Sequence, residues 1–206
     1  MIATIFAASI FLGQEKSAKD FYPLVPNSIW VYQETEKGRK NKSTLELTVG
    51  SAVKFRDHDV IPVVNRLGEI VTNIYYQVTD SEVFVKGYDL EQMLEQPIPI
   101  LKIQGKETNW TYRGSTQLMG YPAPLSMQCT SKLLGKRKVL NEDREILEVK
   151  YKAIIDENRG GLAIESEQTA LYAAGIGLFE MKEIGKFGKQ RTERSLKLIS
   201  YQKGNG

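Results

Sequence analysis

The residues best suited to chemistry are Asp57-His58-Asp59, where two carboxylates flank an imidazole. Such a group could hold a metal ion or orient a general base. Adjacent residues of a strand point to opposite faces of a sheet, so these three side chains would rarely converge. We therefore favour a polar hairpin turn. Because His58 is the only histidine, a zinc site with two histidines cannot form, and a Ser-His-Asp triad would need this residue.

Two other groups could take part in catalysis. Glu165 and Glu167 are spaced to share one strand face, and glycosidases use paired carboxylates about 5 to 9 Å apart across a cleft. A spacing of two is common by chance, however. The single cysteine, Cys129, excludes an internal disulfide and any all-cysteine metal site, and its strand-like neighbours predict a buried structural thiol. We predict no metal, no cofactor and no enzymatic activity.

The most position-specific segment spans residues 169–184, where an aromatic-led strand is interrupted at Gly175-Ile-Gly177 and then resumes. In a dinucleotide-binding fingerprint, the third glycine would fall at Glu180, and no helix pattern follows. Two glycines around one isoleucine instead allow a turn or bulge where a Cβ would clash. This motif therefore predicts a bend in a sheet.

The sequence around these residues predicts short strands almost everywhere. The cleanest alternation covers residues 43–56, and similar segments recur along the chain with tight turns between them. No β-α-β rhythm is present, so we predict a mainly β fold. It is a single antiparallel meander of about eleven strands, curled into a half-barrel or open barrel. One short helix is expected over residues 89–95, capped by Asp89 and ended by Pro97.

The N-terminal segment predicts the cellular compartment of the protein, and the net charge bears on whether it binds nucleic acid. Residues 2–12 form an apolar run that is too short to span a bilayer, so we predict a signal peptide over residues 1–13, with a start codon assigned too late. The alternative is a terminal element packed on the domain. A linker over residues 14–20 and one β domain over residues 21–206 follow. With 28 basic and 25 acidic residues and a net charge of +3, the surface is mixed, which argues against nucleic-acid binding.

Aromatic side chains at alternating strand positions could fill a core or line a pocket for an apolar ligand. A Trp-x-Tyr spacing occurs twice, which raises the hypothesis of two related halves. If the interior is too wide to be filled, the helix over residues 89–95 would be a lid. The predicted ligand-binding residues are then Leu90, Met93, Leu94, Tyr76, Trp110 and Tyr112. The predicted structural motif consists of Trp30, Tyr32, Tyr172, Gly175 and Gly177.

Several of these motifs together resemble a group of poorly characterised exported bacterial proteins. They are Phe21-Tyr-Pro-Leu24, the two Trp-x-Tyr pairs, and residues 171–178 (Leu-Tyr-Ala-Ala-Gly-Ile-Gly-Leu). Members of the group typically carry Tyr-Phe-Pro-Leu before Gly-x-x-Trp-x-Tyr, and later Tyr-Ala-Pro-Gly-Val-Gly-Leu-Val. Here the first aromatic pair is swapped, Asn27 replaces a glycine and Ala174 replaces a proline. The resemblance covers residues 21–202 and implies a curved sheet similar to the lipoprotein-carrier half-barrels of the bacterial envelope. It supplies no catalytic residues.

Three functional hypotheses follow. The first is a non-enzymatic exported protein, periplasmic or extracellular, that binds a lipid or other apolar ligand in the curved sheet. It would be neither membrane-spanning nor lipid-anchored, because no cysteine lies near the apolar run. The second is a structural or assembly module that binds a protein partner through a sheet edge or aromatic surface. The third is a hydrolase that uses His58 or the Glu165 and Glu167 pair.

Overall fold

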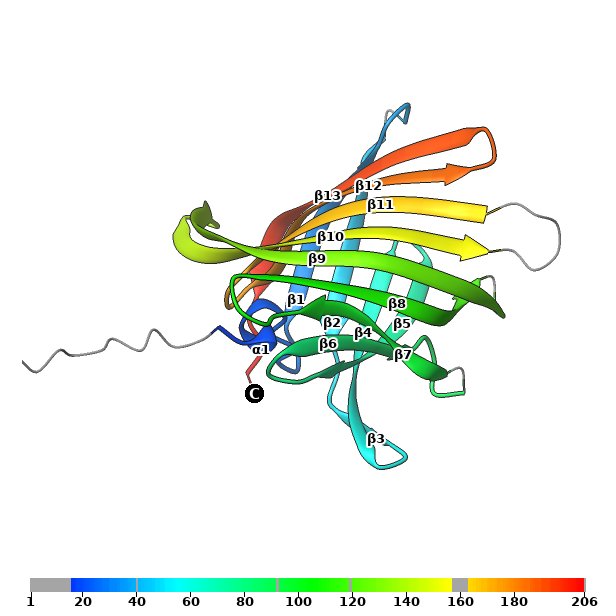
Figure 1. Ribbon diagram of the computed structural model, residues 1–206. Helices are drawn as coiled ribbons and strands as arrows, with labels where there is room; N and C mark the ends of the chain where they lie inside the picture. Colours follow the sequence, from blue (N-terminus) through cyan, green and yellow to red (C-terminus); the bar gives the residue numbers. More distant parts are fainter. Residues whose placement is uncertain (1–15, 40, 92, 119, 157–162, 206) are drawn as a thin grey trace, which may run out of the picture.

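The computed structural model describes residues 16–39, 41–91, 93–118, 120–156 and 163–205. Within these ranges the chain forms one helical turn and thirteen strands (Figure 1). The helical turn is α1 (Ala18–Phe21). The strands are β1 (Ile29–Glu36), β2 (Ser43–Val49), β3 (Val53–Phe55), β4 (His58–Leu67), β5 (Ile70–Val78), β6 (Glu82–Gly87), β7 (Met93–Lys102), β8 (Glu107–Leu118), β9 (Tyr121–Val139), β10 (Glu142–Asp156), β11 (Ala163–Ala173), β12 (Gly177–Phe187) and β13 (Gln190–Gln202).

The strands form one antiparallel sheet in the order β7-β6-β5-β4-β2-β1-β13-β12-β11-β10-β9-β8, and β3 pairs only with β4. Nearly every neighbour in this order is also a neighbour in sequence, as a meander requires. There are two exceptions. The pairing of β2 with β4 skips only β3, and the pairing of β1 with β13 joins the two ends of the chain with Ile29 opposite Gln202. The sheet curls into a nearly closed barrel (Figure 1). The predicted fold class is confirmed.

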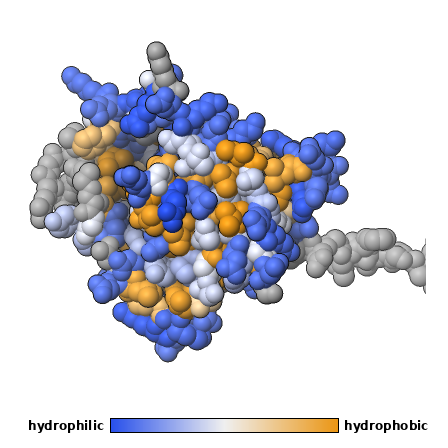
Figure 2. Space-filling view, turned by 180° about the vertical axis from the view of Figure 1, so that it is seen from behind, coloured by the Kyte–Doolittle hydropathy of each residue, from blue (hydrophilic) through white to orange (hydrophobic). Residues whose placement is uncertain are grey.

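The alternating sequence pattern decides which side chains enter the barrel. In β10, Leu147, Val149 and Tyr151 are buried, whereas Lys150 and Lys152, which alternate with them, are exposed. The same period-two pattern in the other long strands creates a continuous apolar interior. On the outer face seen in Figure 2, hydrophobic residues occur in separate groups between hydrophilic ones, which is normal for a protein surface.

The barrel is closed between β7 and β8 by side chains. Four donors on β8, β9 and β10 reach backbone oxygens of β7. The Trp110 indole donates to Pro99 O (3.1 Å) and the Tyr112 hydroxyl to Gln96 O (3.0 Å). The Ser131 hydroxyl donates to Lys102 O and the Tyr151 hydroxyl to Ile100 O. These bonds satisfy edge carbonyls of β7, which would otherwise be open to a further strand.

The predicted helix over residues 89–95 is wrong. Met93 begins β7 and pairs with Gly87 of β6. Asp89 does not cap a helix, because its carboxylate accepts a hydrogen bond from the Glu91 backbone N–H at 2.8 Å and closes a tight turn. A two-turn amphipathic pattern contributes too little helix stability to compete with pairing to β6. The described helix, α1, lies elsewhere.

The start of the described chain is packed against the barrel. The Ser17 and Asp20 side chains form a capping box for α1, in which Ala18 and Phe21 are fully buried. Residues 17–20, which we assigned to a polar linker, are therefore part of the packed structure. The predicted signal peptide lies outside the described residues. No helix in the described ranges is both long and apolar enough to cross a membrane.

Candidate functional site

Asp57, His58 and Asp59 lie in and after the turn between β3 and β4, and all three are exposed. Arg56 has a φ of 52°, as a tight hairpin turn requires. Asp59 forms an ion pair with Lys54 at 2.9 Å. The prediction of a polar hairpin turn is confirmed, since the three side chains do not converge on an enclosed site.

Glu165 and Glu167 share the exposed face of β11. Each faces a lysine of a neighbouring strand, Lys186 at 3.6 Å and Lys152 at 3.7 Å. Cys129 is buried in β9, and burial raises the pKa of its thiol to about 12. A thiol that is protonated at neutral pH is a poor nucleophile. Across the described residues, no group of three or more potential metal ligands lies close together.

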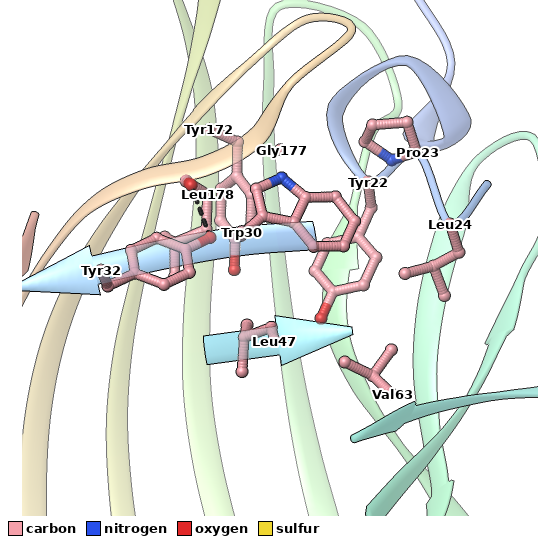
Figure 3. A pocket seen from close by; sticks show the side chains of 10 residues that line it. All are labelled: Tyr22, Pro23, Leu24, Trp30, Tyr32, Leu47, Val63, Tyr172, Gly177 and Leu178. Carbon is pink, nitrogen blue, oxygen red and sulfur yellow. Dashed lines mark hydrogen bonds between the residues drawn. The ribbon is translucent and has the colours of Figure 1, made fainter. Parts of the chain in front are cut away.

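The strongest candidate site is an apolar cavity of about 60 Å³ inside the barrel, at the end where α1 lies (Figure 3). Its walls come from the segment that follows α1 and from the inner faces of β1, β2, β4, β11 and β12. Most of the lining is aromatic or aliphatic. The lining residues are Tyr22, Pro23, Leu24, Trp30, Tyr32, Leu47, Val63, Tyr172, Gly177 and Leu178.

Trp30 and Tyr32 hold the β11–β12 turn over this cavity. The Trp30 indole N–H donates to Ile176 O at 2.5 Å. The Tyr32 hydroxyl donates to Leu178 O at 2.8 Å, and this second bond is the dashed line in Figure 3. The second Trp-x-Tyr pair, on β8, binds carbonyls of β7 in the same manner. Both pairs place two donors on one strand face, and both fix a crossing segment of backbone.

The β11–β12 turn needs its glycines because of its backbone conformation. Gly175 has a φ of 77° and Gly177 a φ of 100°, a region that L-residues with a Cβ rarely adopt. The Gly175 N–H also donates to Asp20 O at 2.7 Å, which attaches α1 to the turn. The prediction of a bend in the sheet is confirmed.

Gly177→Val is expected to lower the free energy of unfolding by about 1–3 kcal/mol, because a β-branched residue is forced to a positive φ. The added side chain would also face the Trp30 indole, since a Cβ at this position lies 3.5 Å from Nε1. Gly105→Val is the matched control, because Gly105 has a φ of 84° but nothing within 4 Å of a Cβ. Chemical denaturation should show a larger loss of unfolding free energy for Gly177→Val than for Gly105→Val. A fully stable Gly177→Val protein would contradict our reading of the turn.

Five tyrosines meet beside the cavity, four of them buried and one, Tyr22, partly buried. The Tyr22 ring lies 5.3 Å from the Tyr76 ring and 6.0 Å from the Tyr172 ring, centroid to centroid. Side-chain hydrogen bonds join Tyr22 to Tyr76 and Tyr151 to Tyr172. The fifth member, Tyr32, is bonded to the backbone as described above. Phenol groups thus give an otherwise apolar interior several hydrogen-bonding groups.

Burial raises the pKa of every member of this tyrosine cluster, because a phenolate would be deprived of water. Desolvation is the largest cause for each, and it raises the pKa of Tyr172 to about 12. For Tyr22 and Tyr32, neighbouring phenols raise the pKa further. The cluster therefore stays neutral at physiological pH, which suits a neutral, apolar ligand.

The structure separates the predicted ligand-binding residues from this cavity. Leu94, Tyr76, Trp110 and Tyr112 are buried in the core, Met93 is half-buried, and Leu90 is 45% exposed in the β6–β7 turn. None of the six lines the cavity. Four of the five predicted structural-motif residues do line it, namely Trp30, Tyr32, Tyr172 and Gly177.

Sequence reasoning missed Tyr22, Leu47 and Val63 as lining residues. Leu47 and Val63 were assigned to strands, but an inward-facing position does not reveal whether the side chain meets a cavity or another side chain. Tyr22 belongs to Phe21-Tyr-Pro-Leu24, which we identified as a motif without a role. Its position directly after α1 places it across the barrel end.

No family model matches this sequence, and a search of curated proteins finds no significant match. A candidate lipoprotein from Parabacteroides distasonis ATCC 8503 has a similar structure, with a TM-score of 0.52 and 11% identity, over 92% of this chain and 100% of that one. A candidate exported protein with a YmcC-like fold from Bacteroides fragilis NCTC 9343 gives a TM-score of 0.44 and 9% identity, over 86% of this chain and 96% of that one. At 11% identity, the first likeness establishes a shared fold.

Proposed function

We propose that this is an exported, non-enzymatic protein that binds a small apolar ligand, or one end of a longer one such as an acyl chain, in the cavity beside Tyr22. The observation that carries the proposal is an apolar, aromatic-walled cavity at one end of the barrel, next to neutral phenols. Export is supported by the apolar run over residues 2–12. The structural likeness to a candidate lipoprotein agrees with it.

The size of the cavity limits what it can hold. An apolar cavity of roughly 150 Å³ accepts benzene, and one water occupies about 30 Å³ of liquid. At about 60 Å³, the cavity admits a short apolar group but not a whole acyl chain. A longer ligand would need one wall to move.

The wall formed by residues 22–24 is the one best suited to move. It follows α1, which is a single short turn attached by Ala18 N–H to Asp80 O (2.6 Å) and by Asp20 O to the Gly175 N–H (2.7 Å). The other walls belong to strands paired along their length. The lid of the proposed site is therefore the segment over residues 18–24, and not residues 89–95.

Val63→Phe tests this function, because the larger side chain would fill the cavity that Val63 lines. We expect the wild-type protein to bind xenon, followed by ¹²⁹Xe NMR, and to gain thermal stability with lauric acid. Val63→Phe should lose both effects and remain folded. Leu47→Phe is a second cavity-filling variant, in case Val63→Phe fails to fold.

Val71→Phe is the matched control for this experiment, because Val71 is 50% exposed on β5. It should leave xenon binding and the response to lauric acid unchanged. The proposal fails if the wild-type protein binds neither probe and native mass spectrometry shows no co-purified ligand. It also fails if both cavity-filling variants bind both probes as the wild-type protein does.

The alternative function is recognition of a protein partner by strand addition. The closure of the barrel limits the sheet edges to which a partner strand could add. Carbonyls along the free edge of β7 already accept bonds from side chains. The other end of the sheet is β8, which pairs along its length with β9 alone and faces β7 across the same closure. A partner strand that adds to β8 would therefore have to separate β8 from β7.

A further inference from the structure

Two hairpin ends carry an unusual concentration of positive charge. Residues 37–42 (Lys-Gly-Arg-Lys-Asn-Lys) connect β1 to β2, and residues 186–191 (Lys-Phe-Gly-Lys-Gln-Arg) form the end of the β12–β13 hairpin. Together these segments, called the basic tips below, hold seven basic residues and no acidic one. Because the whole chain has a net charge of +3, the rest of it carries a net charge of −4.

The sheet places the basic tips side by side, although they are far apart in sequence. The strands are ordered β2-β1-β13-β12, with Glu36 opposite Arg194. The Lys37 backbone N–H donates to Glu193 O at 2.9 Å, which attaches one tip to the base of the other hairpin. In Figure 1 both tips lie at the end of the barrel away from the β9–β10 turn and α1.

Carboxylates beside the basic tips neutralise part of this charge. Glu193 pairs with Lys37 and Arg191, Glu36 with Arg39, and Glu165 with Lys186. The structure describes six of the seven basic side chains, and against these three carboxylates they leave an excess of three positive charges. Exposed ion pairs of this kind are weak, so the cations stay available to an anionic partner.

Apolar side chains are exposed at the same end of the barrel as these cations. Phe187, at the end of the β12–β13 hairpin, is 39% exposed although it is aromatic. Ile70 is 64% exposed on the β4–β5 hairpin, which is the next hairpin in strand order and ends at the same end of the barrel. Exposed apolar side chains flanked by Lys and Arg are the combination that binds the interface of an anionic bilayer.

We propose that the basic tips dock the protein on the surface of an anionic lipid bilayer, with Phe187 inserted between headgroups. A nucleic acid is a weaker match, because single strands are bound on platforms of several aromatic rings in a basic groove, and the tips offer one ring. The surface is separate from the cavity, which lies at the α1 end, so the inference does not rest on the proposed function.

The test is binding of the full chain to vesicles in which about a third of the lipid is phosphatidylglycerol and the rest phosphatidylcholine. We expect binding that weakens as salt is added, and little binding to phosphatidylcholine alone. The triple variant K186Q/K189Q/R191Q should bind on the order of 100-fold more weakly, about fivefold for each cation removed. Phe187→Ser should weaken binding without changing its dependence on salt.

The matched control is K136Q/R137Q/K138Q, which removes the same charge from exposed residues of β9 at the opposite end of the barrel. It should bind as the wild-type protein does. The proposal is overturned if the control loses as much binding as the tip variant, or if phosphatidylcholine vesicles bind equally well. It is also overturned if single-stranded DNA binds more tightly than vesicles with the same dependence on the tips. Circular dichroism of each variant establishes that it is folded.

Discussion

Raising the pH from 10 to about 12 is expected to unfold the protein in one cooperative step. The tyrosine cluster (Tyr22, Tyr32, Tyr76, Tyr151 and Tyr172) consists of four buried phenols and the partly buried Tyr22, and each phenol has a raised pKa. In the unfolded chain the same groups ionise near pH 10. Above that pH the unfolded state binds fewer protons than the folded state, so stability falls as the pH rises.

The magnitude follows from the shift in pKa. For Tyr172, a pKa raised from 10 to about 12 corresponds to about 3 kcal/mol, which is present below pH 10 and is lost as the pH rises to about 12. A domain is stabilised by roughly 5–15 kcal/mol in total. Ionisation of several cluster members on unfolding is therefore sufficient to remove the fold.

Phenolate absorbance and circular dichroism, recorded together against pH, measure this transition. We expect the phenolate absorbance of the five cluster tyrosines to appear at the midpoint of the change in circular dichroism. The slope of the unfolding free energy against pH reports the number of protons released on unfolding, and Tyr172→Phe should lower that number by about one. Tyr121→Phe, at an exposed position in the β8–β9 hairpin, should leave the transition unchanged. Ionisation of all tyrosines with the β-sheet signal intact would contradict the prediction.

Trp30→Ala is expected to lower the free energy of unfolding by about 3–5 kcal/mol. Trp30 is 4% exposed, its ring stacks on Tyr201 at 5.4 Å, and it lines the cavity. Removing the indole would enlarge the cavity and leave Ile176 O without its donor. Both effects are destabilising, and the sheet around the site cannot collapse to fill the space.

Trp30→Phe separates the two contributions. It retains most of the ring but leaves the buried carbonyl unpaired, which should cost about 1–3 kcal/mol. Denaturation with urea measures both variants. The Trp30→Ala variant should also bind a larger apolar ligand than the wild-type protein, because its cavity is larger. A loss below about 1 kcal/mol for Trp30→Ala would show that the ring is not part of the packed core.

The strand pattern and the bend at Gly175-Ile-Gly177 were predictable because they depend on local physics. Alternating side chains decide which face of a strand is buried, and β10 shows this residue by residue. Positive φ at Gly175 and Gly177 is a property of the backbone that glycine alone adopts readily. The hairpin turn at Asp57 and His58 was predictable because it too depends only on residues next to one another in the sequence.

The helix expected over residues 89–95 was wrong because it was predicted from the local sequence pattern alone. Its apolar spacing fits one helical face, but pairing of β7 with β6 and the side-chain donors from β8, β9 and β10 stabilise a strand. Those partners lie up to about fifty residues away in the chain, since Tyr151 binds Ile100. Segment propensity contains no information about such contacts.

By itself, the sequence determined an antiparallel β fold, its inward faces and its glycine bend, because each depends on side chains a few residues apart. Only the tertiary structure decided where a cavity remains, since this depends on how Tyr22, Leu47 and Val63 from three separate elements meet. Likewise, an overall charge of +3 suggested a mixed surface. Pairing of β1 with β13 brings the two basic tips together, because register between distant strands, and not composition, sets the charge of a surface.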